Sequence, residues 1–378
     1  VVVAPNTFRG SLDAFEAASI IADGFRTVLP DAKILEIPVS DGGDGTVRVL
    51  KHFLGGEIIE TEATNVVGEP LTAKWAVLDD GEVAVIEASE ASGFRGLEKR
   101  DIDPMAATSF GTGQLIKAAL DRGCRNLILG LGGSATTDAG TGILKALGIL
   151  LLDRNGKEIG PGGGALADLD RIDVGSMDKR IGDAEITVAC DVDAKLYGEN
   201  GAALMFGPQK GATQAQARKL DSNLRRFAKV VSICLGKDIS KLKYGGASGG
   251  IGSGLYAACS AELRNGTELI LEKIGLEKEF AGCDLVVTGE GKFDRQSLSG
   301  KAPIGVARLA KGYGIPVILI TGQIDENLTK GSTSGFDGMF SICNDSISVQ
   351  ESIKHARTLL RDLSEQIARD HFSKLHDS

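Results

Sequence analysis

Histidine is scarce in this sequence: the 378 residues include only His52, His355, His371 and His376. Three of these four lie near the end of the chain, away from the motifs described below. A Ser-His-Asp hydrolase or a histidine-ligated metal enzyme needs imidazoles beside its other site residues. We therefore expect chemistry that uses carboxylates, lysines, arginines and backbone amides.

The sequence also lacks paired cysteines, long apolar runs and basic clusters. Its six cysteines form no C-x-x-C pair, which argues against zinc and thioredoxin-like sites and favours reduced, buried thiols. No apolar stretch reaches the roughly 18 residues of a membrane span, and residues 1–5 do not resemble a secretion signal. We expect a cytoplasmic protein with no membrane partner. The net charge of −9, without a Lys/Arg cluster, also argues against a nucleic-acid partner.

Glycine, in contrast, is abundant: the 51 glycines are nearly twice the usual share of about 7%. Many lie in glycine-rich segments that we expect to be turns, most of which contain acidic residues and follow a short apolar run. Glycine lets backbone N–H groups converge on an anion, while a nearby carboxylate can hold the neutralising cation. These turns predict binding of a nucleotide or a phosphorylated metabolite. They cover residues 38–46, 129–138, 249–254 and 287–294.

The length and the hydrophobic pattern together predict two domains. Helix and strand patterns alternate at both ends of the chain, whereas residues 58–88 have a hairpin-like pattern. We predict an α/β protein with a discontinuous Rossmann-like parallel-sheet domain (1–55 and 266–378) and an inserted second α/β domain (56–265). The active site is then expected in the interdomain cleft, at the carboxyl ends of strands. The first helix is expected to begin at Ser11. Further helices are expected at 44–54, 111–122, 222–235, 302–313 and 349–367.

Two known nucleotide-binding motifs are relevant to so glycine-rich a chain. The P-loop pattern G-x-x-x-x-G-K-[ST] is absent, which excludes a Walker-type NTPase but not phosphoryl transfer. Residues Gly130 to Ala135 fit G-x-G-x-x-G/A, and Asp153 follows a later apolar run, so the alternative is an NAD-dependent hydroxyacid dehydrogenase. The same pattern recurs at residues 252–257, which makes it weak evidence in so glycine-rich a chain. A two-lobed solute-binding protein is a third alternative.

Acidic and basic residues follow the predicted strands near the C-terminal part of the chain. Glu290 and Asp294 come after the strand expected at 285–288, where they could bind metal or substrate. Lys301 precedes Pro303 at the start of a helix, and free N–H groups at a helix start favour phosphate. The alternative is that these acids only cap turns.

Three further charged residues are candidates for the same chemistry. Asp191 follows the strand expected at 184–190 and could serve as a base or a metal ligand. Lys210 lies between two glycines and could contact a phosphate. Arg9, after the first strand, could hold a substrate carboxylate or form an exposed salt bridge. Phosphoryl transfer suits such a set, because it needs mainly positioning and charge neutralisation.

Six ordered segments across essentially the whole chain resemble the type-one glycerate kinase family. They are APNTFRGSL (4–12), SDGGDGT (40–46), GLGGSATTD (130–138), ACDVD (189–193), FGPQKGA (206–212) and TGEGKFD (288–294). The resemblance implies ATP-dependent phosphorylation of glycerate by a two-domain α/β enzyme. It leaves open which hydroxyl is phosphorylated, which enantiomer is used and whether the chain forms a homo-oligomer.

The resemblance also suggests roles for the candidate residues. Glycerate is expected to be held through its carboxylate by Arg9 and the backbone near Ser11, with Glu290 and Asp294 also binding substrate. Asp191 is expected to accept the hydroxyl proton, and Lys210 or Lys301 to stabilise charge on the phosphoryl group. Mg²⁺ is expected on some of Asp41, Asp44, Asp191 and Glu290. ATP is expected against Gly132, Gly133, Ser134, Thr136, Asp138, Gly289 and Gly291.

The sequence departs from the family pattern at three positions of interest. Asn6 stands where the family usually has Asp, which weakens metal binding by that loop. Arg9 replaces Lys but keeps the charge, and it can grip a carboxylate in two-point fashion. Asp44 replaces Glu and shortens the reach by one methylene. The charges of the central acids are kept, so we expect activity to be kept as well.

Overall fold

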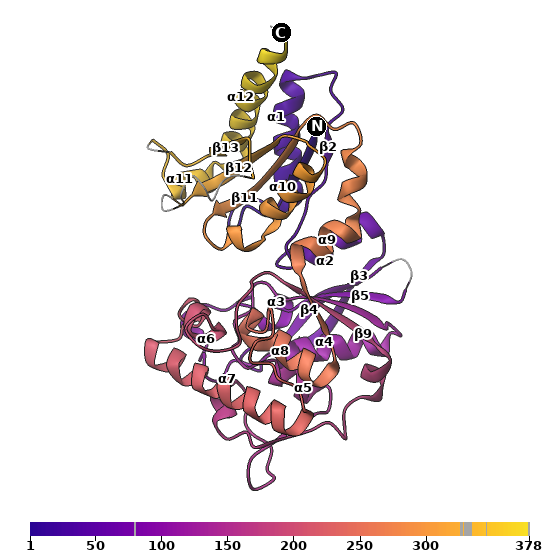
Figure 1. The fold of residues 1–378 in the computed structure, drawn as a ribbon, viewed down its shortest axis with the longest axis vertical. Helices are drawn as coiled ribbons and strands as arrows, with labels where there is room; N and C mark the ends of the chain where they lie inside the picture. Colours follow the sequence, from indigo (N-terminus) through magenta and orange to yellow (C-terminus); the bar gives the residue numbers. More distant parts are fainter. Residues whose placement is uncertain (79–80, 326–327, 329–334, 345, 377–378) are drawn as a thin grey trace. The chain divides into compact units, whose positions relative to one another are not determined.

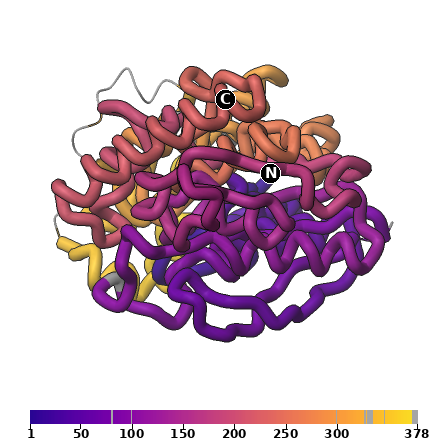
Figure 2. Tube along the Cα trace, turned by 90° about the horizontal axis from the view of Figure 1, so that it is seen from below, coloured from indigo at the N-terminus to yellow at the C-terminus, as the bar shows by residue number. Residues whose placement is uncertain are grey.

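The computed structural model describes residues 1–78, 81–325, 328, 335–344 and 346–376. The chain forms two compact units: unit 1 comprises Val1–Asp41 and Thr267–Ser378, and unit 2 comprises Gly42–Gly266. In Figures 1 and 2, the indigo start and the orange-to-yellow end of the chain belong to unit 1, and the purple-to-salmon middle forms unit 2.

Unit 1 contains a five-stranded parallel sheet, in the order β13-β12-β11-β1-β2. The N-terminal strand lies beside β11, with Val3 opposite Val287, so the two ends of the chain share one sheet. This pairing gives the parallel sheet that the alternating pattern predicted. The strands are β1 (Val2–Pro5), β2 (Leu35–Glu36), β11 (Val286–Phe293), β12 (Val317–Ile324) and β13 (Gly338–Ser341).

Helices α1 (Ala14–Val28) and α12 (Ala356–His376) pack side by side in unit 1 (Figure 1). Their approach requires a glycine, because a Cβ built on Gly24 would lie 2.6 Å from Cβ of Ser364. Both helices share a buried core with the sheet. The other helices of this part are α9 (Gly266–Ile274), α10 (Ala302–Gly312), which packs on β11 and β12, and α11 (Val349–Lys354).

Unit 2 contains a six-stranded mixed sheet, in the order β10-β9-β6-β5-β4-β3. Strands β3, β4 and β5 are antiparallel, as the hairpin-like pattern predicted, whereas β5, β6, β9 and β10 are parallel. The carboxyl ends of these parallel strands therefore meet at one edge. The strands are β3 (Glu57–Thr64), β4 (Pro70–Val77), β5 (Val83–Glu87), β6 (Asn126–Gly130), β9 (Glu185–Cys190) and β10 (Glu262–Asn265); β7 (Leu150–Leu152) and β8 (Arg171–Asp173) form a separate pair.

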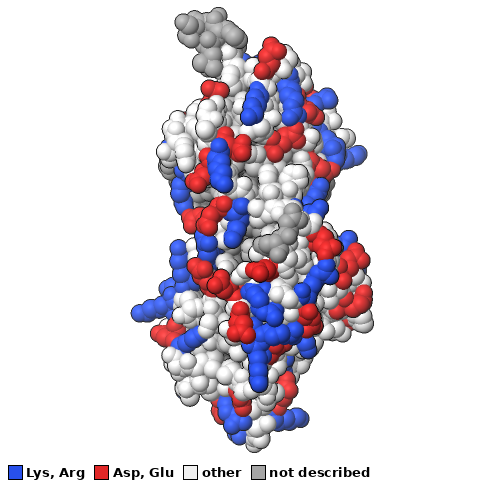
Figure 3. Space-filling view, turned by 90° about the vertical axis from the view of Figure 1, so that its right-hand side faces the viewer, with Lys and Arg blue, Asp and Glu red and all other residues white. Residues whose placement is uncertain are grey.

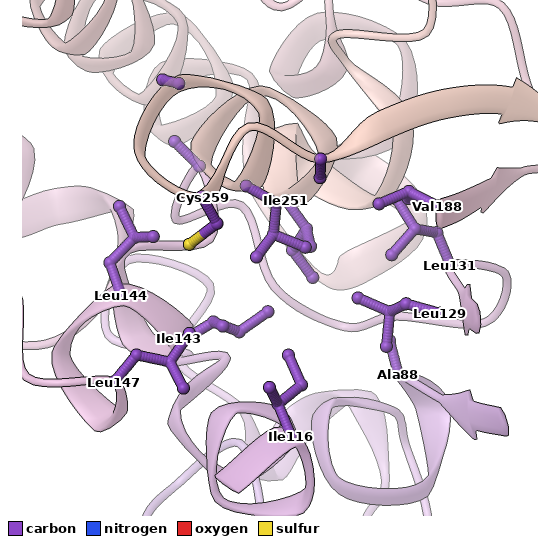
Figure 4. Packing of buried hydrophobic residues seen from close by; sticks show 14 of the residues in the cluster. Ala88, Ile116, Leu129, Leu131, Ile143, Leu144, Leu147, Val188, Ile251 and Cys259 are labelled. Atoms are coloured by element: carbon purple, nitrogen blue, oxygen red, sulfur yellow. The ribbon is translucent and has the colours of Figure 1, made fainter. Parts of the chain in front are cut away.

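A large hydrophobic core joins this sheet to its helices. Figure 4 shows Leu129 and Val188 of the strands facing Ile116, Ile143 and Ile251 of the helices, and all five are buried. The helices of unit 2 are α2 (Thr46–Leu54), α3 (Ser89–Ser92), α4 (Phe110–Asp121), α5 (Thr141–Ala146), α6 (Ala202–Phe206), α7 (Gln214–Leu235) and α8 (Ala247–Cys259).

The first unit ends earlier than the sequence indicated. Residues 1–55 were assigned to the first domain, but α2 packs on β4 and β5 and belongs to unit 2. Its apolar residues Val47, Val49 and Leu50 are buried there. The chain therefore passes between the units at Asp41 and Gly42, inside the first glycine-rich segment. The interdomain cleft remains a prediction.

Two segments predicted as turns have regular structure instead. Strand β11 continues through residues 289–293 and stays paired with β12, with Glu290 opposite Thr321. Gly289 is needed in this strand because its Cβ would lie 2.2 Å from the carbonyl oxygen of Ile320. Residues 249–254 lie in α8, which begins with a left-handed stretch at 248–250. Close packing accounts for the glycines there, since a Cβ on Gly254 would lie 2.1 Å from the carbonyl oxygen of Ala139.

Two helix boundaries also differ from the prediction. The single helix expected at 349–367 is divided into α11 and α12 at His355, which has non-helical dihedrals of φ −112° and ψ 20°. Helix α1 is capped by Asp13 rather than Ser11. The Asp13 side chain accepts a hydrogen bond from the backbone N–H of Glu16, and the Glu16 side chain accepts one from the backbone N–H of Asp13. Ser11 donates instead to the carbonyl oxygen of Phe8, in the preceding turn.

Charge is mixed on the face of the molecule shown in Figure 3, where Lys and Arg are interspersed with Asp and Glu. This face offers no extended basic surface for a nucleic acid. Across the residues that the structure describes, no helix is both long enough and apolar enough to span a bilayer.

The capping box of α1 leads to a stability prediction. Replacing Asp13 by Ala removes the acceptor for the Glu16 N–H and should lower the free energy of unfolding by about 1 kcal/mol. Ser11→Ala should cost less than about 0.5 kcal/mol, because Ser11 caps no helix N–H. Urea unfolding followed by circular dichroism measures both. A larger loss for Ser11→Ala than for Asp13→Ala would show that the helix cap is misassigned.

Candidate active site

The edge of the unit 2 sheet is covered by the segment 42–45, which lies directly on the ends of β6 and β9. The N–H of Gly132 donates to the carbonyl oxygen of Gly42 over 3.1 Å. A Cβ built on Gly130 would lie 2.6 Å from that same oxygen, and one built on Gly42 would lie 2.9 Å from the carbonyl oxygen of Ala189. Main chain therefore touches main chain here, and no side chain can be inserted.

This packing brings two of the predicted acidic residues to the second glycine-rich segment, residues 129–138, called the glycine loop below. A Cβ built on Gly132 would lie 3.6 Å from Oδ2 of Asp191, and one on Gly133 would lie 2.8 Å from Oδ1 of Asp44. Asp44 is held in place by the Ser89 hydroxyl, which donates to the same Oδ1 over 2.9 Å. Asp191, Asp44 and the glycines of the loop, predicted separately from the sequence, thus lie together in unit 2.

Lys210 is buried against the same loop. Its ammonium donates to the hydroxyl of Ser134 (3.1 Å) and to the carbonyl oxygen of Thr136 (2.6 Å). Burial lowers the pKa of Lys210 to about 8, although the negative charges of Asp191 and Asp138 partly oppose this. An ammonium has three donors, so the third can serve a bound anion. Lys210 therefore places a positive charge close to Asp191.

Asp138 is engaged by its own loop and by Ser109, before α4. Its carboxylate accepts four hydrogen bonds, from the N–H and hydroxyl of Ser109 and from the N–H groups of Gly140 and Gly142. It is fully buried, so the contacts favour a role in shaping the loop. The hydroxyl of Thr136 is also buried, and it has no hydrogen-bond partner among the described residues.

Cys190 lies directly before Asp191 but is not suited to nucleophilic chemistry. Burial, and then the charges of Asp191 and Asp193, raise the pKa of the Cys190 thiol well above its usual value. Because the thiolate is the reactive form of cysteine, a raised pKa makes Cys190 unreactive. Cys190 belongs to the buried core of unit 2, as the sequence suggested.

In unit 1, the predicted residues gather where the loop after β1 meets β11. The N–H of Asn6 donates to the carbonyl oxygen of Gly289, and that of Gly291 donates to the carbonyl oxygen of Thr7. A Cβ built on Gly291 would lie 2.8 Å from the backbone nitrogen of Arg9, so glycine permits this approach. The Oδ1 of Asn6 accepts from the N–H of Thr7, a contact that an Asp at this position could also make. The Arg9 side chain is exposed.

Glu290 projects from β11 in this part of unit 1. It is only 6% exposed, and its Oε1 finds no hydrogen-bond partner among the described residues. Burial raises the pKa of Glu290 to about 7; a hydrogen bond with Ser297 and the charge of Lys301 lower it, and Asp41 and Asp294 raise it. A buried carboxyl oxygen without a partner is costly and is typical of a binding site.

Asp294 and Lys301 flank a short helical turn after β11. The Asp294 carboxylate accepts from the N–H groups of Gln296 (2.8 Å) and Ser297 (3.3 Å), so it caps this turn. Lys301 is the N-cap residue of α10 and is half-buried, with Pro303 in the first turn as predicted. The first N–H groups of this helix can favour an anion.

The acids predicted to bind Mg²⁺ are divided between the units: Asp41 and Glu290 belong to unit 1, and Asp44 and Asp191 to unit 2. No group of three or more potential ligands is preassembled in the described part of the chain. Mg²⁺ often uses one or two carboxylates together with substrate phosphates and waters, so its binding remains a proposal. Within unit 1, Glu290 has a buried oxygen without a partner among the described residues, and within unit 2, Asp191 lies beside the glycine loop.

Sequence reasoning missed three side chains that hold these loops. Glu87 ends β5 and accepts a hydrogen bond from the N–H of Val47; Ser89 and Ser109 hold Asp44 and Asp138. The sequence did contain an indication for Glu87, because it is an acidic residue at the end of an apolar strand, much as Asp191 directly follows one. The two serines carried none, since their roles depend on contacts between distant segments.

The structure does not favour the dehydrogenase alternative. In the dinucleotide fold, the glycine motif leads directly into a helix, but here α5 begins only at Thr141, after the loop that continues from Ala135. Asp153 is not beside that loop's strand: its carboxylate accepts from the N–H groups of Asn155 and Lys157 in the turn after β7.

Comparisons with known proteins identify the family of this chain. The glycerate kinase family matches residues 1–371. A Bacillus subtilis (strain 168) protein named glycerate kinase is 43% identical, over 97% of this chain and 96% of its own length. An Escherichia coli (strain K12) protein named glycerate 2-kinase is 42% identical, over 97% of each chain. A crystal structure of a protein provisionally assigned as glycerate kinase 2, from Salmonella typhimurium LT2, matches with a TM-score of 0.83 and 40% identity, over 99% of this chain and 98% of that one. The chain belongs to the glycerate kinase family.

Proposed function

We propose that this chain, a phosphotransferase of the glycerate kinase family, transfers the terminal phosphoryl group of Mg²⁺-ATP to a hydroxyl group of glycerate. The observation that carries the proposal is the buried Lys210 ammonium, which lies on the glycine loop beside Asp191. A positive charge and a carboxylate at the carboxyl ends of parallel strands are suited to phosphoryl transfer.

The nucleotide is assigned to the glycine loops. In unit 2, Gly133 and Ser134 offer backbone N–H groups, and Gly132, whose own N–H is bound to Gly42, lets the loop pass close to the segment 42–45. The unpartnered hydroxyl of Thr136 offers a further donor, and Asp138 shapes the loop. Gly289 and Gly291 are the corresponding glycines of unit 1. Lys210 or Lys301 stabilises the charge on the transferred phosphoryl group. Backbone N–H groups and ammonium groups are the donors that phosphate oxygens require.

Glycerate is assigned to the loop after β1. Arg9 is exposed, and a guanidinium can hold the glycerate carboxylate with two parallel hydrogen bonds. The backbone near Ser11 is assigned to the same site, although the N–H of Ser11 itself donates to the carbonyl oxygen of Phe8. Glu290 and Asp294 accept from the glycerate hydroxyls. Because Arg9 and Glu290 belong to unit 1 and Asp191 to unit 2, the proposal includes the interdomain cleft expected from the sequence.

In the proposed reaction, the Asp191 carboxylate takes the proton of the attacking hydroxyl. The hydroxyl oxygen forms a bond to the terminal phosphorus, and the bond between that phosphorus and the bridging oxygen breaks to release ADP. Mg²⁺ would neutralise charge on the phosphates, with oxygen ligands drawn from Asp41, Asp44, Asp191 and Glu290.

The direct test is ADP release from Mg²⁺-ATP with and without D-glycerate, followed by phosphorus NMR of the product. We expect release that depends on glycerate, and the NMR spectrum then identifies the phosphorylated hydroxyl. A parallel incubation with NADH and a keto acid should leave the nicotinamide absorbance unchanged. Folded protein without glycerate-dependent release, or with NADH oxidation, would overturn the proposal.

Asp191→Asn should lower kcat by about 10²–10⁴, because the amide cannot accept the hydroxyl proton. The matched control is Asp193→Asn, which keeps an oxygen for the N–H of Tyr244 and should stay near the parent rate. Steady-state kinetics at saturating ATP and glycerate measures both. An unchanged kcat in Asp191→Asn would remove this residue from proton transfer.

The burial of Lys210 leads to a pH prediction. Its pKa is lowered to about 8, so the ammonium that binds phosphate is lost as pH rises through 8. We expect kcat/KM for ATP, which reports the free enzyme, to fall up to tenfold per pH unit above that value. In Lys210→Arg the charge persists to high pH, so this alkaline fall should disappear even if the overall rate is lower. The same fall in both proteins would assign it to another group.

A further inference from the structure

Glu87 is a buried carboxylate that none of the proposed catalytic steps uses. It is the last residue of β5 and is 7% exposed. Burial raises its pKa to about 7, against hydrogen bonds from the backbone N–H groups of Val47 and Gly45, which lower it. The fold therefore keeps a costly polar group at the edge of the sheet where the glycine loops meet.

The partners of Glu87 lie at the start of α2. The N–H of Val47 donates to Oε1 of Glu87 over 2.7 Å, and a second hydrogen bond comes from Gly45. The helix has no cap of its own, because its N-cap residue is Gly45, in a left-handed conformation with no side chain to bind the free N–H groups. A carboxylate from a different strand thus supplies the cap that the local sequence lacks.

The residues before this helix are the ones that touch the glycine loop at residues 129–138. Gly42 accepts from the N–H of Gly132, Asp44 lies against Gly133, and Ser89, two residues after Glu87, holds Asp44. The end of β5 therefore fixes the segment 42–45 from both sides. It holds the helix start through Glu87 and the acidic side chain through Ser89.

We propose that Glu87 is a positioning residue, which caps α2 from strand β5 and thereby fixes Asp44 and the segment 42–45 against the glycine loop. Glu87 does not touch the reacting atoms. The inference rests on the proposed kinase function, since it assigns the fixed segment to that reaction. A displacement of about 1 Å in such a segment can lower a rate by 10².

Three variants separate positioning from charge and from general stability. Glu87→Leu removes both acceptors, and Glu87→Gln keeps one amide oxygen for the N–H of Val47 while removing the charge. Ser348→Ala is the matched control, because it also removes a helix cap, the local N-cap side chain of α11, which belongs to unit 1. Each variant is assayed for kcat and KM with Mg²⁺-ATP and glycerate, and for its unfolding midpoint in urea.

We expect Glu87→Leu to lower kcat about 10- to 100-fold, Glu87→Gln to recover at least a third of the parent kcat, and Ser348→Ala to keep the parent kcat. Hydrogen exchange without substrates should show faster exchange in residues 42–50 of Glu87→Leu and no change in α1. A parent protein without glycerate-dependent turnover would refute the kinase proposal itself, and the exchange result would still test the cap.

Two outcomes would overturn the positioning role. The first is a Glu87→Gln variant as slow as Glu87→Leu, which would assign the effect to charge. The second is a Glu87→Leu variant with the parent kcat, or with unchanged exchange at residues 42–50. If Glu87→Leu does not fold, Glu87→Gln and the exchange of its residues 42–50 decide between the same alternatives.

Discussion

The structure of unit 2 depends on one close approach of main chain to main chain. Segment 42–45 lies on the ends of β6 and β9 with no side chain between them, and Gly132 donates directly to the carbonyl oxygen of Gly42. A single added carbon on Gly132 would lie 2.4 Å from Cα of Gly43. Glycine is required here for its lack of volume, because Gly132 does not have a positive φ. Most of the unit's candidate catalytic groups are placed by this contact.

Several charged groups around the glycine-rich segments are buried. Desolvation lowers the pKa of Lys210 to about 8 and raises those of Glu87 and Glu290 to about 7. Each shift opposes the charged form, so each charge is held at a cost in stability. Lys210 is compensated by two hydrogen bonds and by neighbouring acids, and Glu87 by the start of α2. Buried groups with shifted pKa values, such as Lys210 and Glu87 in unit 2 and Glu290 in unit 1, are typical of functional sites.

Much of this arrangement could be predicted from the sequence. The alternation of patterns predicted a parallel sheet built from both ends of the chain, and the hairpin-like middle predicted antiparallel strands. Asp191 was identified because it follows an apolar strand, and carboxyl ends of parallel strands meet at one edge. The six segments that resemble the glycerate kinase family identified the family itself, because long ordered motifs are far more specific than isolated glycine patterns.

The remaining features depend on contacts between distant segments, which local patterns do not record. Glycines at 289 and 291 indicated a turn, but they permit close packing within a strand instead. The cap of α1 is an exception, because Ser11 and Asp13 are both good N-cap residues and the reciprocal contact that selects Asp13 is a local one, with Glu16. The position of Glu87 at the end of an apolar strand could have marked it as a candidate, but its role as a helix cap could not be predicted, because its partner Val47 lies 40 residues earlier in the chain. The division at Asp41 was missed because α2 is amphipathic and could have packed on either sheet.

The most direct test of the account is the kcat of Gly132→Ala, measured beside Gly182→Ala. Both add one methyl group without backbone strain, but a Cβ on Gly182 would meet no atom within 4 Å, whereas one on Gly132 would press on Gly43. The account predicts that folded Gly132→Ala loses at least about 10² in kcat, because Asp44 and Asp191 are displaced from the loop, while Gly182→Ala keeps the parent rate. Equal rates for the two variants would contradict the claim that this main-chain contact positions the catalytic groups.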